Sequence, residues 1–126
     1  MARLEEYAEK YDNIRMERKD GILQLTFHSE GDSLRWGLTP NREFGVAFAD
    51  IGSDPENKVV IMTGTGDDYC VERAGDLPPI KTAADWEAVY WDSKKLLTNL
   101  LDIEAPIISA VNGPATYRAE IPVLSD

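Results

Sequence analysis

The sequence has almost no cysteine or histidine and no long hydrophobic segment. Cys70 and His28 are the only residues of their kinds among 126, which excludes an internal disulfide and a zinc site built from such side chains. No apolar run reaches the roughly 18 residues of a membrane span. The first ten residues are charged and acidic, unlike a secretory or transit peptide. We therefore expect a cytoplasmic protein that uses no metal and no cofactor.

Basic residues are scarce relative to acidic ones. The chain contains 13 lysines and arginines against 23 aspartates and glutamates, which gives a net charge of −10. An acidic surface repels nucleic acid and anionic lipid, because binding either one requires a basic face. The length, with 43% hydrophobic and 29% charged residues, is typical of one modest domain or part of a larger one. We expect a small-molecule substrate and no nucleic-acid or membrane partner.

The first part of the chain predicts a β-hairpin followed by a loop. Residues 13–18 and 22–27 are strand-like. The Asp20-Gly21 pair between them favours a tight turn, because both residues tolerate positive φ. Residues 29–38 are polar and interrupted by glycine, and we expect them to form a loop that carries Trp36.

Two helices and two apolar strands follow in alternation. Residues 40–51 predict a helix with Thr39 as its N-cap, and residues 59–63 form a β-branched strand that is apolar on both faces. A second helix is expected from Thr82 to about residue 102, before another two-sided strand at 107–111. This order predicts an α/β fold with a mostly parallel sheet and flanking helices. The second helix is expected to bury a stripe made of Trp86, Val89, Tyr90, Leu96, Leu97, Leu100 and Leu101.

Each of the two apolar strands runs into a loop with a distinctive sequence. The first reads Ile-Met-Thr-Gly-Thr-Gly-Asp-Asp-Tyr-Cys at 61–70, and the second reads Ala-Val-Asn-Gly-Pro-Ala at 110–115. In this order, about forty residues apart, they resemble the crotonase (enoyl-CoA hydratase/isomerase) superfamily. Residues 112–116 and 120–126 look most like the 6-oxocamphor hydrolase type, which are β-diketone hydrolases. The resemblance covers nearly the whole chain but only the N-terminal half of that family's core domain.

The resemblance implies a fold, a reaction and a set of site residues. Residues 1–126 would be the N-terminal portion of a crotonase-like ββα spiral, apparently truncated. The implied reaction is a retro-Claisen cleavage between two carbonyls, with an oxyanion hole formed by two backbone N–H groups. Ungapped matching places these donors at Arg73 and Arg118. The implied substrate-binding residues around them are Trp36, Glu72, Tyr117 and Glu120.

Several positions differ from the family pattern. The family's glycines, which permit positive φ, are replaced here by Glu72, Tyr117, Arg118 and Ala119. The family's later acid–base residues lie beyond residue 126, so we expect this chain alone to be inactive. The resemblance also implies assembly as homotrimers or hexamers, largely through C-terminal helices that we expect to lie outside residues 1–126.

Other functions and roles remain open from the sequence alone. The same resemblance allows an enoyl-CoA hydratase or isomerase that acts on a CoA thioester, and a third reading is a catalytically inactive truncated or interaction module. His28 is expected to be a structural or surface residue, and Cys70 to be a buried small hydrophobe. Trp36 either lines a pocket or packs under its own loop. Trp86, Tyr90 and Trp91 are expected in the core or an interface.

Overall fold

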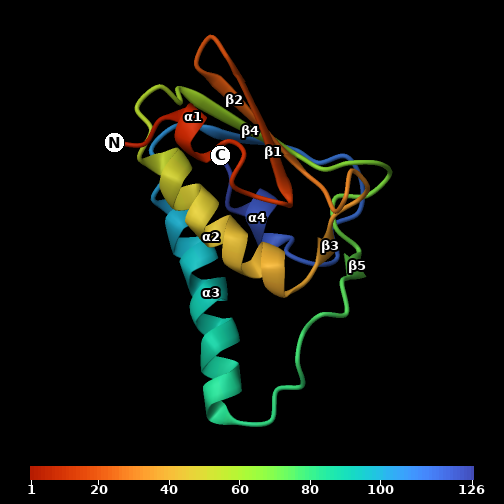
Figure 1. Cartoon of the computed structure of the whole chain (residues 1–126). Helices are drawn as coiled ribbons and strands as arrows, with labels where there is room; N and C mark the ends of the chain where they lie inside the picture. Colours follow the sequence, from red (N-terminus) through yellow and green to blue (C-terminus); the bar gives the residue numbers. More distant parts are fainter.

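A four-stranded sheet packed against two long helices forms most of the molecule (Figure 1). The computed structural model describes residues 1–126. In chain order the elements are α1 (Leu4–Tyr7), β1 (Ile14–Lys19), β2 (Ile22–Phe27), β3 (Arg35–Trp36), α2 (Leu38–Gly52), β4 (Val59–Thr63), β5 (Glu72–Arg73), α3 (Ala83–Leu101), β6 (Ile107–Ala110) and α4 (Glu120–Val123).

The main sheet has the strand order β1-β2-β4-β6. Strands β2, β4 and β6 run parallel, and β1 pairs antiparallel with β2. The turn between β1 and β2 places Asp20 at φ 53° and Gly21 at φ 80°, the two positive values of a hairpin turn. The predicted hairpin and the mostly parallel α/β sheet are therefore confirmed.

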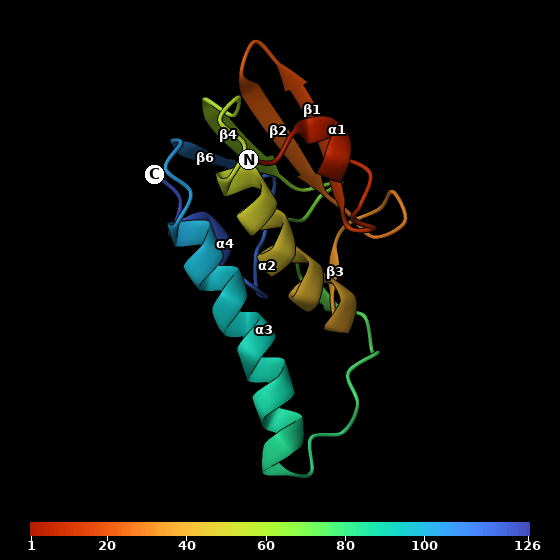
Figure 2. The same ribbon diagram turned by 60° about the vertical axis from the view of Figure 1, so that its left-hand side comes forward.

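The core lies between one face of this sheet and helices α2 and α3, which lie side by side in Figure 2. Phe44 of α2 is at its centre, with ring centroids 4.7 Å from Phe27 and 5.2 Å from Trp36. Each aromatic ring buries a large apolar area, and edge and tilted contacts between rings add to that stabilisation. The apolar stripe of α2, made of Phe44, Ala47, Phe48 and Ile51, packs here.

The opposite face of the sheet is only partly covered. Val60 and Met62 of β4 are fully buried, whereas Ile61 between them is half-buried. On the same outer face, Ile108 of β6 remains 54% exposed. The expectation that both faces of these strands are covered is therefore not met within residues 1–126, because both long helices pack on the same side.

The predicted ends of the helices are right for α3 and wrong for α2. Thr82 caps α3 through its side chain, which accepts a hydrogen bond from Asp85 N, as the capping-box pattern predicts. Helix α2 begins earlier than expected, with Gly37 rather than Thr39 as its N-cap. The amide of Leu38 donates to Asp76 Oδ1 at 3.0 Å, so a distant loop satisfies the helix start that Thr39 was expected to cap.

The buried stripe predicted for α3 is confirmed only in its C-terminal half. Leu96 and Leu100 are buried, but Trp86 and Tyr90 are 57% and 53% exposed and Leu101 is 60% exposed. The N-terminal half of α3 extends beyond the sheet in both ribbon views, so it has no strand to pack against (Figures 1 and 2). The length of α3 carries its first turns past the core.

Three short elements were not expected. Strands β3 and β5 form a separate two-stranded parallel sheet, and α4 is a single turn where the sequence indicated no closing helix. The β3 and β5 strands depend on pairing between residues far apart in the chain, which local sequence patterns do not reveal. No helix in the structure is both long and apolar enough to cross a membrane.

A buried polar cluster connects α1, β1 and the turn after α2. Asp54 Oδ2 accepts hydrogen bonds from Tyr7 Oη and from Arg18 Nη1, both at 2.7 Å. Asn57 completes the cluster by donating to Tyr7 Oη at 3.0 Å and accepting from Arg18 at 2.8 Å. Burial opposes the ionisation of Asp54, but these hydrogen bonds and the Arg18 charge hold the pKa of its carboxyl below the usual value.

Replacement of Asp54 by asparagine is expected to lower the free energy of unfolding by about 3 kcal/mol at neutral pH, because it leaves the Arg18 charge without its partner. The folded-state pKa of Asp54 is depressed, so its stabilisation is present above about pH 4, the unfolded value, and is lost as the pH falls through the folded value. Urea unfolding between about pH 2 and 7 measures this dependence.

The matched control for this prediction is Asp12→Asn, which removes an exposed carboxylate that makes no hydrogen bond through its side chain. The wild type and Asp12→Asn should lose stability in parallel as the pH falls, while the gap between the wild type and Asp54→Asn narrows. A gap that stays constant down to about pH 2 contradicts the assignment of the linkage to Asp54.

Candidate active site

The loops that follow β4 and β6 begin at the same edge of the sheet, because these two strands are parallel neighbours. The side chain of Asn112 joins the loops at that point. Its Oδ1 accepts from Gly64 N at 3.1 Å, and its Nδ2 donates to the carbonyl oxygens of Gly66 and Asp68 at 2.9 and 3.0 Å. One amide side chain thus makes three hydrogen bonds across the two loops.

Backbone hydrogen bonds extend this connection along both loops. The amides of Tyr69 and Cys70 donate to Pro114 O, at 2.9 and 3.2 Å. In return, the amides of Thr116 and Tyr117 donate to Cys70 O, at 3.0 and 3.1 Å. The two sequence motifs therefore lie side by side, as the resemblance implied, and they are hydrogen-bonded to each other.

Gly113 permits the closest approach between the loops. A Cβ atom at this position would overlap the carbonyl oxygen of Asp67 and lie 2.9 Å from the Cα of Asp68. No side chain larger than hydrogen is compatible with that spacing. The glycine of the second motif is thus explained by steric exclusion.

The Arg73 amide does not take part in the pairing of β5 with β3. Strand β5 pairs with β3, and Ala74 N donates to Trp36 O at 2.7 Å. Because alternate residues of a paired strand turn their N–H groups to opposite sides, the Arg73 N–H points away from β3.

The Arg118 amide has no hydrogen-bond acceptor within the protein. Arg118 also has a φ of 55°, a value that glycine adopts readily and other residues rarely do. The resemblance implied glycines in this region, and a positive φ at Arg118 is the conformation that glycine would adopt most easily. Such strain costs roughly 1–3 kcal/mol and is concentrated at functional sites.

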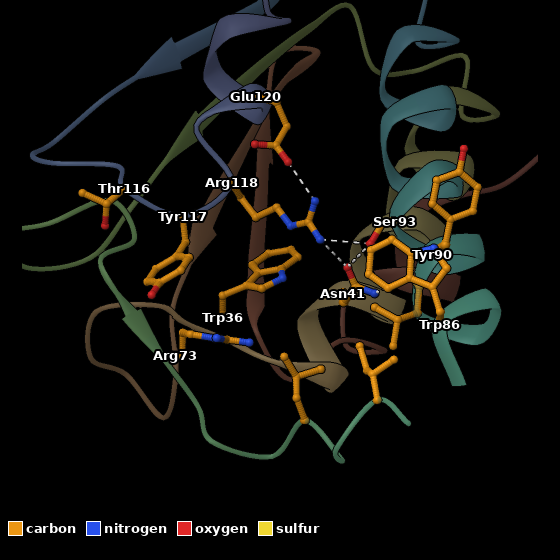
Figure 3. A pocket seen from close by; sticks show the side chains of 13 residues that line it. Trp36, Asn41, Arg73, Trp86, Tyr90, Ser93, Thr116, Tyr117, Arg118 and Glu120 are labelled. Atoms are coloured by element: carbon orange, nitrogen blue, oxygen red, sulfur yellow. Dashed lines mark hydrogen bonds and ion pairs between the residues drawn. The ribbon is translucent and has the colours of Figure 1, made fainter. Parts of the chain in front are cut away.

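Both arginines line a cavity of about 480 Å³ (Figure 3). Figure 3 shows Thr116, Tyr117 and Arg73 on one side and Trp86 and Tyr90 on the other, with Arg118 and Trp36 between them. The full lining consists of Trp36, Asn41, Arg73, Leu77, Ile80, Trp86, Val89, Tyr90, Ser93, Thr116, Tyr117, Arg118 and Glu120.

The Arg118 side chain connects four elements around this cavity. Its Nη1 donates to Glu120 Oε1 at 2.8 Å, and its Nη2 donates to Asn41 Oδ1 at 2.9 Å and Ser93 Oγ at 3.0 Å. The guanidinium carbon also lies 4.8 Å from the ring centroid of Trp36, a cation–π arrangement. These contacts to α4, α2, α3 and β3 offset the strain of the Arg118 backbone.

The structure gathers five of the six residues implied by the resemblance. Arg73, Arg118, Tyr117 and Glu120 line the cavity together with Trp36. Trp36 fulfils both roles that the sequence allowed, because it is 6% exposed and packs against Phe44 while one part of it faces the cavity.

Glu72 does not line the cavity. It lies in a separate polar hollow together with Asp32 and Asp68. Neighbouring residues of a strand point to opposite faces, so Arg73 and Glu72 of β5 face different spaces. The structure therefore separates Glu72 from the other implied substrate-binding residues.

Sequence reasoning missed five cavity residues on α2 and α3, which are Asn41, Trp86, Val89, Tyr90 and Ser93. Asn41 and Ser93 face each other across α2 and α3, with Ser93 Oγ donating to Asn41 Oδ1 at 3.0 Å. Trp86 and Tyr90, expected in the core or an interface, instead stack with centroids 6.4 Å apart on the cavity wall. A polar residue at the buried end of the α2 stripe was the available signal for Asn41, whereas nothing local marked Ser93.

The single histidine and the single cysteine lie outside the cavity. His28 Nδ1 accepts a hydrogen bond from Gly31 N at 3.0 Å, so the ring stabilises its own turn as predicted. Cys70 is fully buried, and burial raises the pKa of its thiol to about 11. The thiol is therefore a buried hydrophobe rather than a nucleophile. No group of three or more His, Cys, Asp or Glu side chains is placed to hold a metal ion.

Replacement of Gly113 by alanine is expected to push the two loops apart and lower the free energy of unfolding by about 2 kcal/mol, a usual cost of overpacking. Amide hydrogen exchange should accelerate at Tyr69 and Thr116, whose N–H groups span the loops. Gly52→Ala is the matched control, since its Cβ would meet only Ile103 at an ordinary 3.5 Å. Equal stability of the two variants would contradict the steric argument.

Comparison with known proteins places this arrangement in a family. A β-diketone hydrolase from the cyanobacterium Anabaena sp. PCC 7120, solved bound to (S)-3-oxocyclohexyl acetic acid, superposes with a TM-score of 0.90 and 43% identity. The alignment covers 96% of this chain and 49% of that one. An enoyl-CoA hydratase/isomerase from Mycobacterium paratuberculosis shares the fold, with a TM-score of 0.81 at 19% identity over 94% of this chain and 49% of that chain.

A curated relative extends the comparison at the level of sequence. Carnitinyl-CoA dehydratase from Salmonella arizonae is 32% identical over 108 residues, which are 82% of this chain and 40% of the relative. No family model matches the chain. The chain therefore spans between 40% and 49% of the length of these relatives. The hydrogen-bonded pair of motif loops, the sheet with its flanking helices and these similarities show that the chain belongs to the crotonase superfamily.

Proposed function

We propose that this chain supplies the oxyanion-binding part of a β-diketone hydrolase. The main observation in support is that the loops after β4 and β6 are hydrogen-bonded together and bring Arg73 and Arg118 to one cavity. The 43% identity to the Anabaena β-diketone hydrolase supports this substrate class. Residues 1–126 would then form one portion of a crotonase-like domain.

The proposed reaction is a hydrolytic retro-Claisen cleavage. The oxygen of water bonds to one carbonyl carbon of the diketone, and the bond from that carbon to the carbon between the two carbonyls then breaks. The electron pair of the broken bond forms an enolate on the second carbonyl, and a proton added at carbon converts the enolate to a ketone. The first carbonyl becomes a carboxylic acid, so one water is consumed overall.

The chain's contribution is to stabilise the enolate oxygen. The amides of Arg73 and Arg118 are the proposed donors, one from each loop. Hydrogen-bond donors fixed in advance at a developing negative charge lower the barrier by roughly 3 kcal/mol each. Because Asn112 and Pro114 hold the loops together, these donors do not have to reorganise during the reaction.

The side chains around the amides suit an apolar ring that carries oxygen. Trp36, Trp86 and Tyr90 provide aromatic walls. The Arg118 guanidinium, held over Trp36, adds positive charge next to the proposed enolate, and Glu120 offsets part of that charge at 2.8 Å. We assign Tyr117 and Glu120 to substrate contact on the same grounds.

A CoA-thioester hydratase or isomerase is the second candidate function. The specific observation in its favour is the 32% identity to carnitinyl-CoA dehydratase. Two backbone amides would serve a thioester oxyanion equally well, so the oxyanion geometry does not separate the two candidates. Ligand binding separates them directly.

A cyclic 1,3-diketone is expected to shift the amide ¹H and ¹⁵N resonances of Arg73 and Arg118 and to quench tryptophan fluorescence from Trp36 and Trp86. The corresponding cyclic monoketone, which is far less acidic, should produce smaller shifts at the same concentration. The amide of Gly31, in a loop outside the cavity, serves as an internal control. Absence of shifts at both arginine amides, or tighter binding of a CoA thioester than of the diketone, contradicts the proposed function.

The 126-residue chain by itself is expected to show no diketone cleavage above the buffer rate. The cavity lining contains no histidine, and its one carboxylate, Glu120, is paired with Arg118. Loss of diketone absorbance measured with the purified chain checks this expectation. Turnover well above background would instead place the water-activating base among these residues.

A further inference from the structure

Arg73 is the only arginine of the chain without a carboxylate partner. The other six lie 2.7–3.7 Å from a carboxylate oxygen. They are Arg3, Arg15, Arg18, Arg35, Arg42 and Arg118. In a chain with ten more acidic than basic residues, one guanidinium left unpaired on a cavity wall has its charge available for a ligand.

Among the charged side chains that line the cavity, the Arg73 guanidinium is again the one without a partner. Its charged side chains are Arg73, Arg118 and Glu120, a balance of two positive and one negative. Glu120 binds Arg118 Nη1, while Asn41 and Ser93 occupy Nη2. The remaining positive charge and a complete set of guanidinium donors therefore belong to Arg73.

The surroundings of Arg73 indicate which kind of ligand its guanidinium can bind. Its guanidinium carbon lies 6.0 Å from the ring centroid of Tyr117, and in Figure 3 both residues lie across the cavity from Trp86 and Tyr90. A ligand that contacts Arg73 from within the cavity thus places its body against aromatic walls. The planar guanidinium fork matches a carboxylate through two parallel hydrogen bonds.

We propose that Arg73 binds the carboxylate of a cyclic keto acid in this cavity. This inference rests on the proposed function, because hydrolytic cleavage of a β-diketone converts one of its two carbonyls to a carboxylate and the other to a ketone. The molecule bound by the Anabaena hydrolase, (S)-3-oxocyclohexyl acetic acid, combines the same ring ketone and carboxylate. Arg73 is therefore a recognition residue for the charged end of the product.

The test is a calorimetric titration of the chain with 3-oxocyclohexylacetate and with its uncharged amide, 3-oxocyclohexylacetamide. The wild type should bind the acid about tenfold more tightly than the amide, the size expected for one charge-assisted pair at a partly exposed site. Arg73→Gln should abolish this preference without weakening amide binding, and Arg73→Lys should retain only part of it. Circular dichroism confirms that the variants fold, as expected for an exposed side chain.

Arg15→Gln is the matched control, because it removes another exposed positive charge, one that lies on β1 and outside the cavity. It should leave the preference for the acid unchanged. Equal affinity of the wild type for acid and amide overturns the proposal, as does equal loss of preference in Arg15→Gln and Arg73→Gln. Binding of CoA that depends on Arg73, with keto-acid binding that does not, also overturns it, because the guanidinium would then be a phosphate site.

Different measurements test the Arg73 side-chain proposal and the proposed function, so the failure of one can be told from the failure of the other. The amide resonances of Arg73 and Arg118 report on diketone binding at the backbone, whereas the acid-to-amide preference reports on the Arg73 side chain. Diketone shifts without an acid preference refute the side-chain proposal alone. An acid preference without diketone shifts refutes the oxyanion proposal alone and leaves an anion site on a cavity of other function.

Discussion

The hydrogen bonds between the loops after β4 and β6 are the constraint on which the site depends. Parallel pairing of the two strands starts both loops at one edge, but pairing alone would leave the loops free to separate. Asn112, together with the carbonyl oxygens of Pro114 and Cys70, holds them in contact. Gly113 makes that contact sterically possible. Every cavity residue contributed by either loop inherits its position from this junction.

Arg118 shows how a side chain can compensate for a backbone conformation that favours glycine. The residue adopts a positive φ, which glycine would adopt at little cost. Its guanidinium then makes contacts to Glu120, Asn41 and Trp36 that no glycine offers. Because these partners belong to α4, α2 and β3, the strained residue also fixes three elements around the cavity. The same residue therefore carries both the backbone strain and the side-chain contacts that offset it.

The sequence predicted the elements better than it predicted which faces they bury. Alternating and β-branched patterns identified β1, β2, β4 and β6, and the Thr82 capping box marked the start of α3. Burial of Trp86 and Tyr90 was predicted wrongly, because periodicity reports an apolar face but not whether anything packs on it. The N-terminal half of α3 extends beyond the sheet and has no strand to pack against. The exposed aromatic residues consequently become a wall of the cavity.

By itself, the sequence determined the family through two short motifs and their spacing, and it located Arg73, Arg118, Trp36, Tyr117 and Glu120 near one site. Only the tertiary structure decided that Glu72 faces another hollow, that Asp76 rather than Thr39 satisfies the start of α2, and that Asn41 and Ser93 hold Arg118. The reason is physical. Local patterns encode backbone preferences within a few residues, whereas these contacts join residues that are brought together by the packing of α2 and α3 on one face of the sheet.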